Sequence, residues 1–355
     1  MFDAAALSPG EVCTTLMGTQ IVTLALQGGG SHGAFTWGVL DRLLEDGRIG
    51  IEGISGASAG AMNAVVLAHG YMEGGNDGAR EALTKFWESV STRDSFNVMP
   101  DEWGAVELAK RSESDPAAKA GLFLSRFFSP YQLNPFNLNP LRDILSSQVD
   151  FDRLKGCKLK LFIAATQVNT GMPRLFGTAE LSLDVLLASA CIPTLHHTIE
   201  IEGEAYWDGG LSANPPIRPL LHLCDASDVL IVLLNPRRRP EVPTSADDIW
   251  HRLTEISFSS ALFSELQGIA LAKREANRSF FALGRLERKL RRLNTHLIDA
   301  QELMSKLSSL SKLNTKAAFI NALRDEGRSR TKTWLDENFK HLGARSSYNL
   351  DEHGY

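Results

Sequence analysis

The residue with the clearest chemical potential is Ser58, the central residue of a GASAG sequence. This GxSxG pattern follows an apolar stretch predicted as a strand (49–54) and opens a helical pattern (59–69). Gly56 and Gly60 remove Cβ clashes in a tight strand-to-helix turn, so the serine hydroxyl can protrude at the end of the strand. The pattern predicts a nucleophilic serine, although such turns also arise for steric reasons alone.

A glycine cluster precedes this serine along the chain. The sequence QGGGSHG follows an apolar stretch predicted as a strand buried on both faces (21–26), again where a strand meets a helix. The backbone N–H groups of such a loop can converge on a small anion. The anion would be either a phosphate or the oxyanion of an ester-hydrolysis intermediate.

The phosphate alternative depends on a dinucleotide-binding pattern. Gly28, Gly30 and Gly33 satisfy GxGxxG, and Glu52 lies near the place of a ribose-binding acid. The loop lacks the Lys-Ser/Thr pair of a P-loop, and a serine turn follows at the very next strand end. A hydrolase explains both glycine clusters at once, so nucleotide binding is the weaker interpretation.

The strongest candidate for a base is Asp208, where a short apolar strand ends in a turn formed with Gly209 and Gly210. A carboxylate is a weak base in water, so this role requires a dry site and a short hydrogen bond to Ser58. An Asp-Gly pair by itself is typical of a structural turn. The histidines of the second half of the chain lie in no late catalytic loop; they include His196, His197, His296, His341 and His353.

The combination of GGGSHG, GASAG and DGG in this order resembles the patatin-like phospholipases. Three further runs, TQVNTG (166–171), ASACIP (188–193) and WDGGLSANPP (207–216), are also similar to family sequence, and the resemblance covers residues 20–235. It implies a catalytic Ser–Asp dyad that acts on acyl esters of lipids without a metal or another cofactor. That dyad and its oxyanion hole would be formed by Ser58, Asp208, Gly28, Gly29 and Gly30.

The glycine loop departs from the family at one position. Many members have Arg or Lys where this chain has His32, which calls into question a fixed cation beside the oxyanion. His32 would either hold the loop through hydrogen bonds or contribute charge when it is protonated. Gly33, Gly56, Gly60, Gly209 and Gly210 are expected to support the site by shaping its turns.

The order of predicted elements favours an α/β fold. Strands alternate with helices in the first hundred residues, which is typical of a mostly parallel sheet covered by helices on both faces. The same periodicities predict later strands at 159–166, 174–176, 198–201 and 229–234, with a helix at 182–189. We therefore expect a three-layer α/β/α, patatin-like catalytic domain at 20–235.

Two segments depart from this pattern. Residues 93–139 are predicted to form a helical insertion, which either packs its aromatic side chains inward or forms a lid or apolar channel. Its aromatic residues are Phe96, Trp103, Phe123, Phe127, Phe128, Tyr131 and Phe136. The second segment, 246–340, is predicted to form a helical C-terminal extension.

Within this extension, apolar residues recur at spacings of three and four over 283–307, a heptad-like stripe that predicts one long helix. A basic cluster lies around its start (273–292). Such a helix would pack on the protein itself or in a homodimer, or would lie on an anionic membrane surface.

Bulk properties limit the remaining functions. The 355 residues carry a net charge of −5, which gives no general attraction for nucleic acid. The four cysteines form no metal-binding or disulfide pattern and are expected to be reduced. The N-terminus lacks the features of a signal peptide, and the longest apolar run (229–234) is too short to span a bilayer. A cytoplasmic location is expected, with peripheral membrane contact through the basic extension as an alternative.

The sequence leaves the substrate open. Besides phospholipids, the same dyad would act on another acyl ester, such as a neutral glyceride or a storage polyester. A chain that kept the fold without turnover would be a non-catalytic lipid-binding protein.

Overall fold

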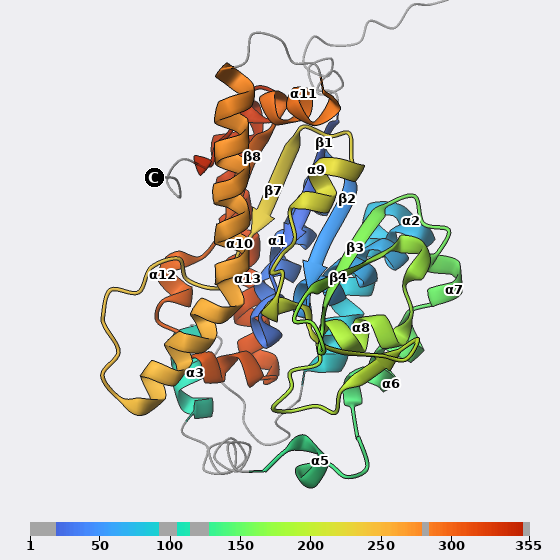
Figure 1. The fold of residues 1–355 in the computed structure, drawn as a ribbon, viewed down its shortest axis with the longest axis vertical. Coiled ribbons are helices and arrows are strands. Elements are labelled where there is room, and N and C mark those ends of the chain that lie inside the picture. The colour runs from blue at the N-terminus through green and yellow to red at the C-terminus, as the bar shows by residue number, and fades with distance from the viewer. Residues whose placement is uncertain (1–18, 92–104, 114–127, 279–283, 351–355) are drawn as a thin grey trace, which may run out of the picture.

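The centre of the molecule is one mixed β-sheet (Figure 1). The computed structural model describes residues 19–91, 105–113, 128–278 and 284–350. The strand order is β5-β6-β3-β2-β1-β7-β8, and β4 also pairs with β3. The strands are β1 Gln20–Leu26, β2 Ile49–Ala57, β3 Lys160–Gln167, β4 Pro173–Gly177, β5 Ile199–Ile201, β6 Glu204–Asp208, β7 Asp228–Val232 and β8 Asn294–Ile298.

Helices cover both faces of this sheet. In Figure 1, α9 and α10 lie in front of the strands, and α1 and α13 lie behind them. The helices are α1 Gly33–Asp46, α2 Ala59–Val90, α3 Ala105–Glu113, α5 Pro130–Leu133, α6 Pro140–Gln148, α7 Phe151–Leu154, α8 Leu183–Ser189, α9 Arg218–Leu223, α10 Ala246–Arg278, α11 Arg285–Arg292, α12 Gln301–Met304 and α13 Ala317–Asn338. The three-layer α/β/α architecture expected from the sequence is confirmed.

Two hydrophobic cores separate these layers, and β7 shows why. Its neighbouring side chains point to opposite faces, as strand geometry requires. Leu230 and Val232 enter the core beneath α1, α2 and α13, whereas Val229 and Ile231 enter the core beneath α9 and α10. A strand that is buried on both faces must be apolar along its whole length, which is the pattern that the sequence showed.

The sheet brings the segments that follow several of its strands to the same edge. β1, β2, β3, β7 and β8 run parallel, so the segments after β1, β2 and β7 meet at the same edge. β6 runs antiparallel to β3, with Asp208 opposite Ala165. Because Ala57 pairs with Ala164, the last residue of β6 lies at the level where β2 ends.

The prediction of one long helix over 283–307 is wrong. The described part of this segment forms α11, the strand β8 and α12. β8 pairs in parallel with all five residues of β7, which fills backbone hydrogen bonds that a sheet edge would otherwise leave open. The apolar stripe is divided accordingly: Leu290 and Leu293 pack under α10, and Met304 and Leu307 join the core on the other face.

The C-terminal segment is docked on the first part of the fold through α13, which packs closely on α1. A Cβ atom on Gly38 would come within 1.9 Å of the Arg324 carbonyl oxygen, so only a glycine allows this approach. Arg328 forms ion pairs with Asp41 and Glu45 of α1. The basic cluster also binds to the protein itself, since Lys289 donates to the carbonyl groups of Cys224 and Ala226.

The aromatic insertion is only partly described. Phe96, Trp103, Phe123 and Phe127 lie outside the described residues, while α3 and α5 confirm helical structure around them. The described aromatic residues do not pack inward: Phe128, Tyr131 and Phe136 are 45%, 54% and 83% exposed.

Two expectations from the bulk properties bear on the described residues. Cys157, Cys191 and Cys224 are free, as expected, and Cys13 lies outside the described residues. Within the described ranges, every helix is too short or too polar to cross a membrane.

Candidate active site

Ser58 occupies a strained turn between β2 and α2. Its φ of 52° and ψ of −125° lie in a region that residues with a side chain rarely adopt. The turn is tight because the chain passes directly beside β1: a Cβ atom on Gly60 would lie 2.1 Å from the Leu26 carbonyl oxygen. Gly56, in contact with Gly60, is needed for the same reason. The sequence motif therefore reflects a real steric requirement.

The Ser58 backbone is fixed by a residue that the motif does not contain. Its N–H group donates to both the carbonyl oxygen and the hydroxyl oxygen of Ser189, at 3.1 and 3.0 Å. Ser189 ends α8 and is fully buried. It lies in the ASACIP run, so the resemblance contained a signal for it, but the residue pattern alone gave it no role.

Asp208 is fully buried at the end of β6 and is held on several sides. Oδ1 accepts a hydrogen bond from the Gly210 N–H at 2.7 Å. The Asp208 backbone donates to the Cys191 carbonyl at 2.8 Å and accepts from the Thr166 hydroxyl at 2.8 Å. These contacts leave the carboxyl group little freedom to turn away from Ser58.

The pKa of Asp208 is raised to about 6, chiefly because burial removes water from the charged carboxylate. The hydrogen bond from Gly210, the Ser58 side chain and the positive charge of Lys312 each lower it again, by smaller amounts. Oδ2 is buried, and no group among the described residues, including Ser58, meets full hydrogen-bond geometry with it. We take the Ser58 contact as a close polar approach with imperfect alignment, since apo catalytic hydrogen bonds are often loose.

The glycine loop lies directly against the serine. A Cβ atom on Gly28 would lie 2.7 Å from the Ser58 Cβ atom, so Gly28 brings the loop into contact with the turn. The Gly28 N–H already donates to Asn214 Oδ1 at 2.6 Å. Gly29 and Gly30 have N–H groups with no such partner in the described part of the chain. Of the three predicted oxyanion donors, these two are available to a ligand.

His32 is buried beside the loop and hydrogen-bonds through Nε2 to the Ser311 hydroxyl at 2.7 Å. Its pKa is lowered well below the usual value by burial and by the nearby charges of Lys312 and Arg239. The ring is therefore neutral at pH 7. This geometry favours loop support over charge.

The other supporting glycines lie where the sequence placed them. Gly33 begins α1, and Gly209 and Gly210 form the short 3-10 turn (Gly209–Leu211) after β6. Asn214, which the sequence did not single out, connects these parts because its side chain also donates to the Phe258 carbonyl of α10 at 3.0 Å. It lies in the WDGGLSANPP run.

Three of the histidines considered as bases are hydrogen-bonded to other groups. The rings of His197, His296 and His341 hydrogen-bond to Pro130, Asp228 and Arg345 respectively, and His353 lies outside the described residues.

The nucleotide interpretation also fails in space. Glu52 accepts hydrogen bonds from Lys160 and from the backbone of Asp225 and Ala226, so it is not available to a ribose.

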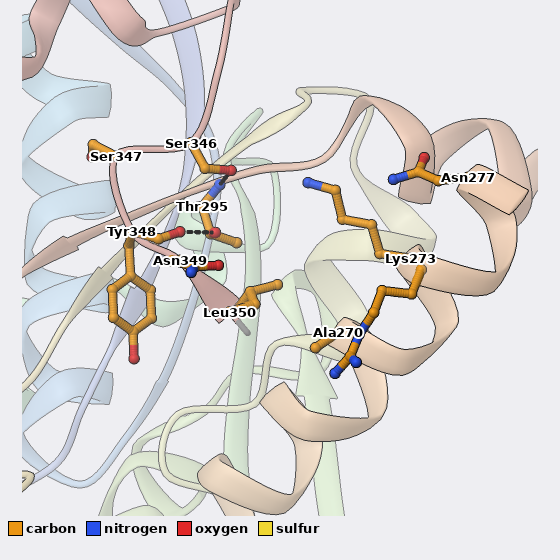
Figure 2. A pocket seen from close by; sticks show the side chains of 10 residues that line it. Ala270, Lys273, Asn277, Thr295, Ser346, Ser347, Tyr348, Asn349 and Leu350 are labelled. Carbon is orange, nitrogen blue, oxygen red and sulfur yellow. Dashed lines mark hydrogen bonds between the residues drawn. The ribbon is translucent and has the colours of Figure 1, made fainter. Parts of the chain in front are cut away.

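A separate pocket of about 330 Å³ lies between α10 and the chain after α13 (Figure 2). Lys273, Asn277, Thr295 and Tyr348 are among the residues that line it. It contains neither Ser58 nor Asp208 and has no part in the site described above. No group of three metal-ligating side chains occurs among the described residues.

Fold and site place the chain among three-layer α/β/α proteins with a serine at a strand-to-helix turn. The model of the patatin-like phospholipase family matches residues 24–221, which is more than half of the chain. The chain therefore belongs to the patatin-like phospholipase family. No curated protein matches it.

Two solved structures are similar to parts of the chain. VipD from Legionella pneumophila is 16% identical with a TM-score of 0.39, and the match covers 89% of this chain and 66% of VipD. The complex of SpcU with ExoU from Pseudomonas aeruginosa contains a chain that is 17% identical with a TM-score of 0.31. The match covers 90% of this chain and 53% of that chain. This chain thus spans less than two thirds of the length of either structure.

Proposed function

We propose that the chain is a serine acyl-hydrolase that cleaves ester bonds of lipids, with Ser58 as the nucleophile and Asp208 as the base. One observation carries this proposal: a serine in a strained turn lies beside a fully buried carboxylate whose pKa is raised to about 6. A carboxylate with that pKa is a better proton acceptor near neutral pH than an ordinary aspartate. Membership of the family supports lipid esters as the substrate class.

The first half of the reaction forms an acyl-enzyme. The Ser58 oxygen attacks the ester carbonyl carbon while its proton passes to Asp208 Oδ2. The electron pair of the carbonyl bond moves to oxygen, where the N–H groups of Gly29 and Gly30 stabilise the negative charge. Collapse of this intermediate breaks the bond to the alcohol, and Asp208 returns the proton to the leaving oxygen.

The second half restores the enzyme. Water attacks the acyl carbon and gives a proton to Asp208, and the same amides hold the second oxyanion. When the bond to Ser58 breaks, the serine oxygen takes this proton and the carboxylic acid leaves. Gly28 remains bonded to Asn214 throughout and holds the loop in place.

The decisive experiment is labelling with a fluorophosphonate probe, followed by mapping of the modified peptide. We expect covalent labelling at Ser58, its loss in Ser58→Ala, and loss of hydrolysis of a chromogenic fatty ester in the same variant. Ser55→Ala is a matched control, because Ser55 is a buried serine of β2, three residues before Ser58, whose hydroxyl has no hydrogen-bond partner among the described residues. Labelling at another residue, or turnover by Ser58→Ala, would overturn the assignment.

A panel of three substrates distinguishes the possible substrate classes. Phosphatidylcholine, a triacylglycerol and poly(3-hydroxybutyrate) present a phospholipid, a neutral glyceride and a storage polyester to the same dyad. We expect the phospholipid to be hydrolysed fastest. A folded protein that binds vesicles but hydrolyses none of the three would be a lipid-binding protein.

A further inference from the structure

A short segment of the C-terminal region lies on the glycine loop. This 3-10 helix, η4 (Ser309–Leu313), lies outside residues 24–221, which match the family. The carbonyl oxygen of Lys312 is so close to the loop that a Cβ atom on Gly30 would lie 2.4 Å from it. The neighbouring Ser311 holds His32. The segment therefore packs against the same loop that carries the two available N–H groups.

The side chain of Lys312 extends from η4 toward the ends of β1 and β7. Its Nζ atom donates to Asn235 Oδ1 at 2.7 Å. The backbone N–H of Asn235 in turn donates to Gln27 Oε1 at 2.8 Å, and Gln27 directly precedes Gly28. The ammonium group is thus tied by a chain of hydrogen bonds to the base of the glycine loop.

The charged groups around Lys312 come from several elements. Glu255 of α10, Arg239 after β7 and Asp208 of β6 all interact electrostatically with it. Glu255 is already paired with Arg239 and Arg252, so its charge is shared. The positive charge of Lys312 in turn acts on both Asp208 and the buried His32. His32 is neutral, so among the described residues Lys312 is a cation whose charge acts on both the loop and Asp208.

We propose that Lys312 supplies the positive charge of the active site, favouring the ionised Asp208 before attack and the oxyanion at Gly29 and Gly30 after it. This role rests on the proposed function of Ser58 and Asp208. Lys312 touches neither reacting atom and acts through its field, which is strong in a buried site. Burial lowers the pKa of Lys312 to about 8, so its charge is present at pH 7 and is lost as the pH rises above 8.

The test compares Lys312→Met, which keeps bulk but removes charge, with Lys312→Arg, which keeps the charge. Both are measured in the full chain by the pH dependence of kcat and KM on a chromogenic ester. We expect Lys312→Met to lower kcat roughly tenfold with little change in KM, and to move the acid limb of the profile to higher pH. Lys312→Arg should keep the wild-type acid limb and extend the plateau above pH 8. A merely structural lysine would give equal losses in both variants without moving either limb.

A second measurement needs no turnover. The carboxyl carbon of Asp208, observed by NMR after selective labelling, reports its titration directly in the wild type and in folded Lys312→Met. A titration that moves to higher pH in the variant supports the inference, and an unchanged titration overturns it. If Ser58→Ala retains turnover while the titration still moves, the proposed function fails and the electrostatic role of Lys312 remains.

Discussion

The two sides of the glycine loop are built in different ways. On one side, Gly28 contacts Ser58 through turns in which any larger residue would clash. On the other, Ser311 and Lys312 reach the loop from a segment that is far away in the sequence. The first side depends on backbone sterics at fixed residues and therefore leaves a motif. The second depends on how α13 and β8 dock, and any chain that docks in the same way would serve.

The largest expected effect lies on the motif side, at Asp208. Asp208→Asn removes the proposed proton acceptor, and we expect turnover to fall by roughly 10³-fold or more. The same variant should gain stability at pH 7, because the folded pKa of about 6 lies above the usual aspartate value of 3.8 and burial penalises the charged form. Stability from this group is full below about pH 4 and is lost as the pH rises through 6, by ~2–3 kcal/mol.

Urea denaturation of Asp208→Asn and the wild type at pH 4 and pH 7 measures this gain. The two proteins should differ more at pH 7 than at pH 4. A mild loss of turnover in this variant would bring a histidine base back into consideration.

The second side of the glycine loop depends on the packing of α13 against α1. Gly38 is the residue at which a substitution disrupts this contact most directly. In Gly38→Ala the new Cβ atom would meet the Arg324 carbonyl of α13, and we expect a loss of ~2–4 kcal/mol in the free energy of unfolding. Gly268→Ala is the matched control, because this helical glycine of α10 has no atom within 4 Å of the added Cβ atom. The control should be neutral or slightly stabilising. Equal thermal shifts in the two variants would contradict the close helix contact.

The pH dependence of the wild type sharpens the role of the buried carboxylate. Asp208 must be ionised to accept the proton, and its pKa is about 6. We therefore expect kcat/KM to be level between about pH 7 and pH 8 and to fall roughly tenfold per pH unit below 6. A profile on a substrate without ionisable groups measures this limb. An acid limb near pH 4 would show that the carboxylate is hydrated during the reaction.

The smallest expected effect concerns the hydrogen bond between His32 of the glycine loop and Ser311 of η4. Ser311→Ala leaves His32 Nε2 without its partner, and we expect a loss of ~1 kcal/mol in stability. Turnover should fall only a few-fold, because His32 is neutral and supports the loop without touching the reacting atoms. Ser329→Ala, on exposed α13 surface, provides a control for serine removal in the same segment. A loss of turnover as large as that of Asp208→Asn would mean that His32 takes part in the chemistry.

Sequence alone determined much of the fold. The central strands β1, β2, β3 and β7 follow from continuous apolar runs, because a strand that is covered by helices on both faces must be apolar along most of its length. The prediction of one long helix over 283–307 was wrong because the apolar spacing in this segment fits a helix as well as it fits a strand between two helices. The segment forms a strand because β8 pairs with the edge of β7, and no local sequence pattern shows that this edge is available.

The site shows the same division. Ser58, Asp208 and the glycine loop could be predicted as a candidate site from sequence, because a tight turn admits few residue types and leaves glycine at fixed spacings. The residue patterns did not indicate which side chain binds the Gly28 N–H group, which residue holds the Ser58 backbone, or which cation lies near the loop. The tertiary structure showed these three residues. Asn214 and Ser189 act through a few hydrogen bonds and Lys312 through its charge, and these interactions require no pattern in the neighbouring residues.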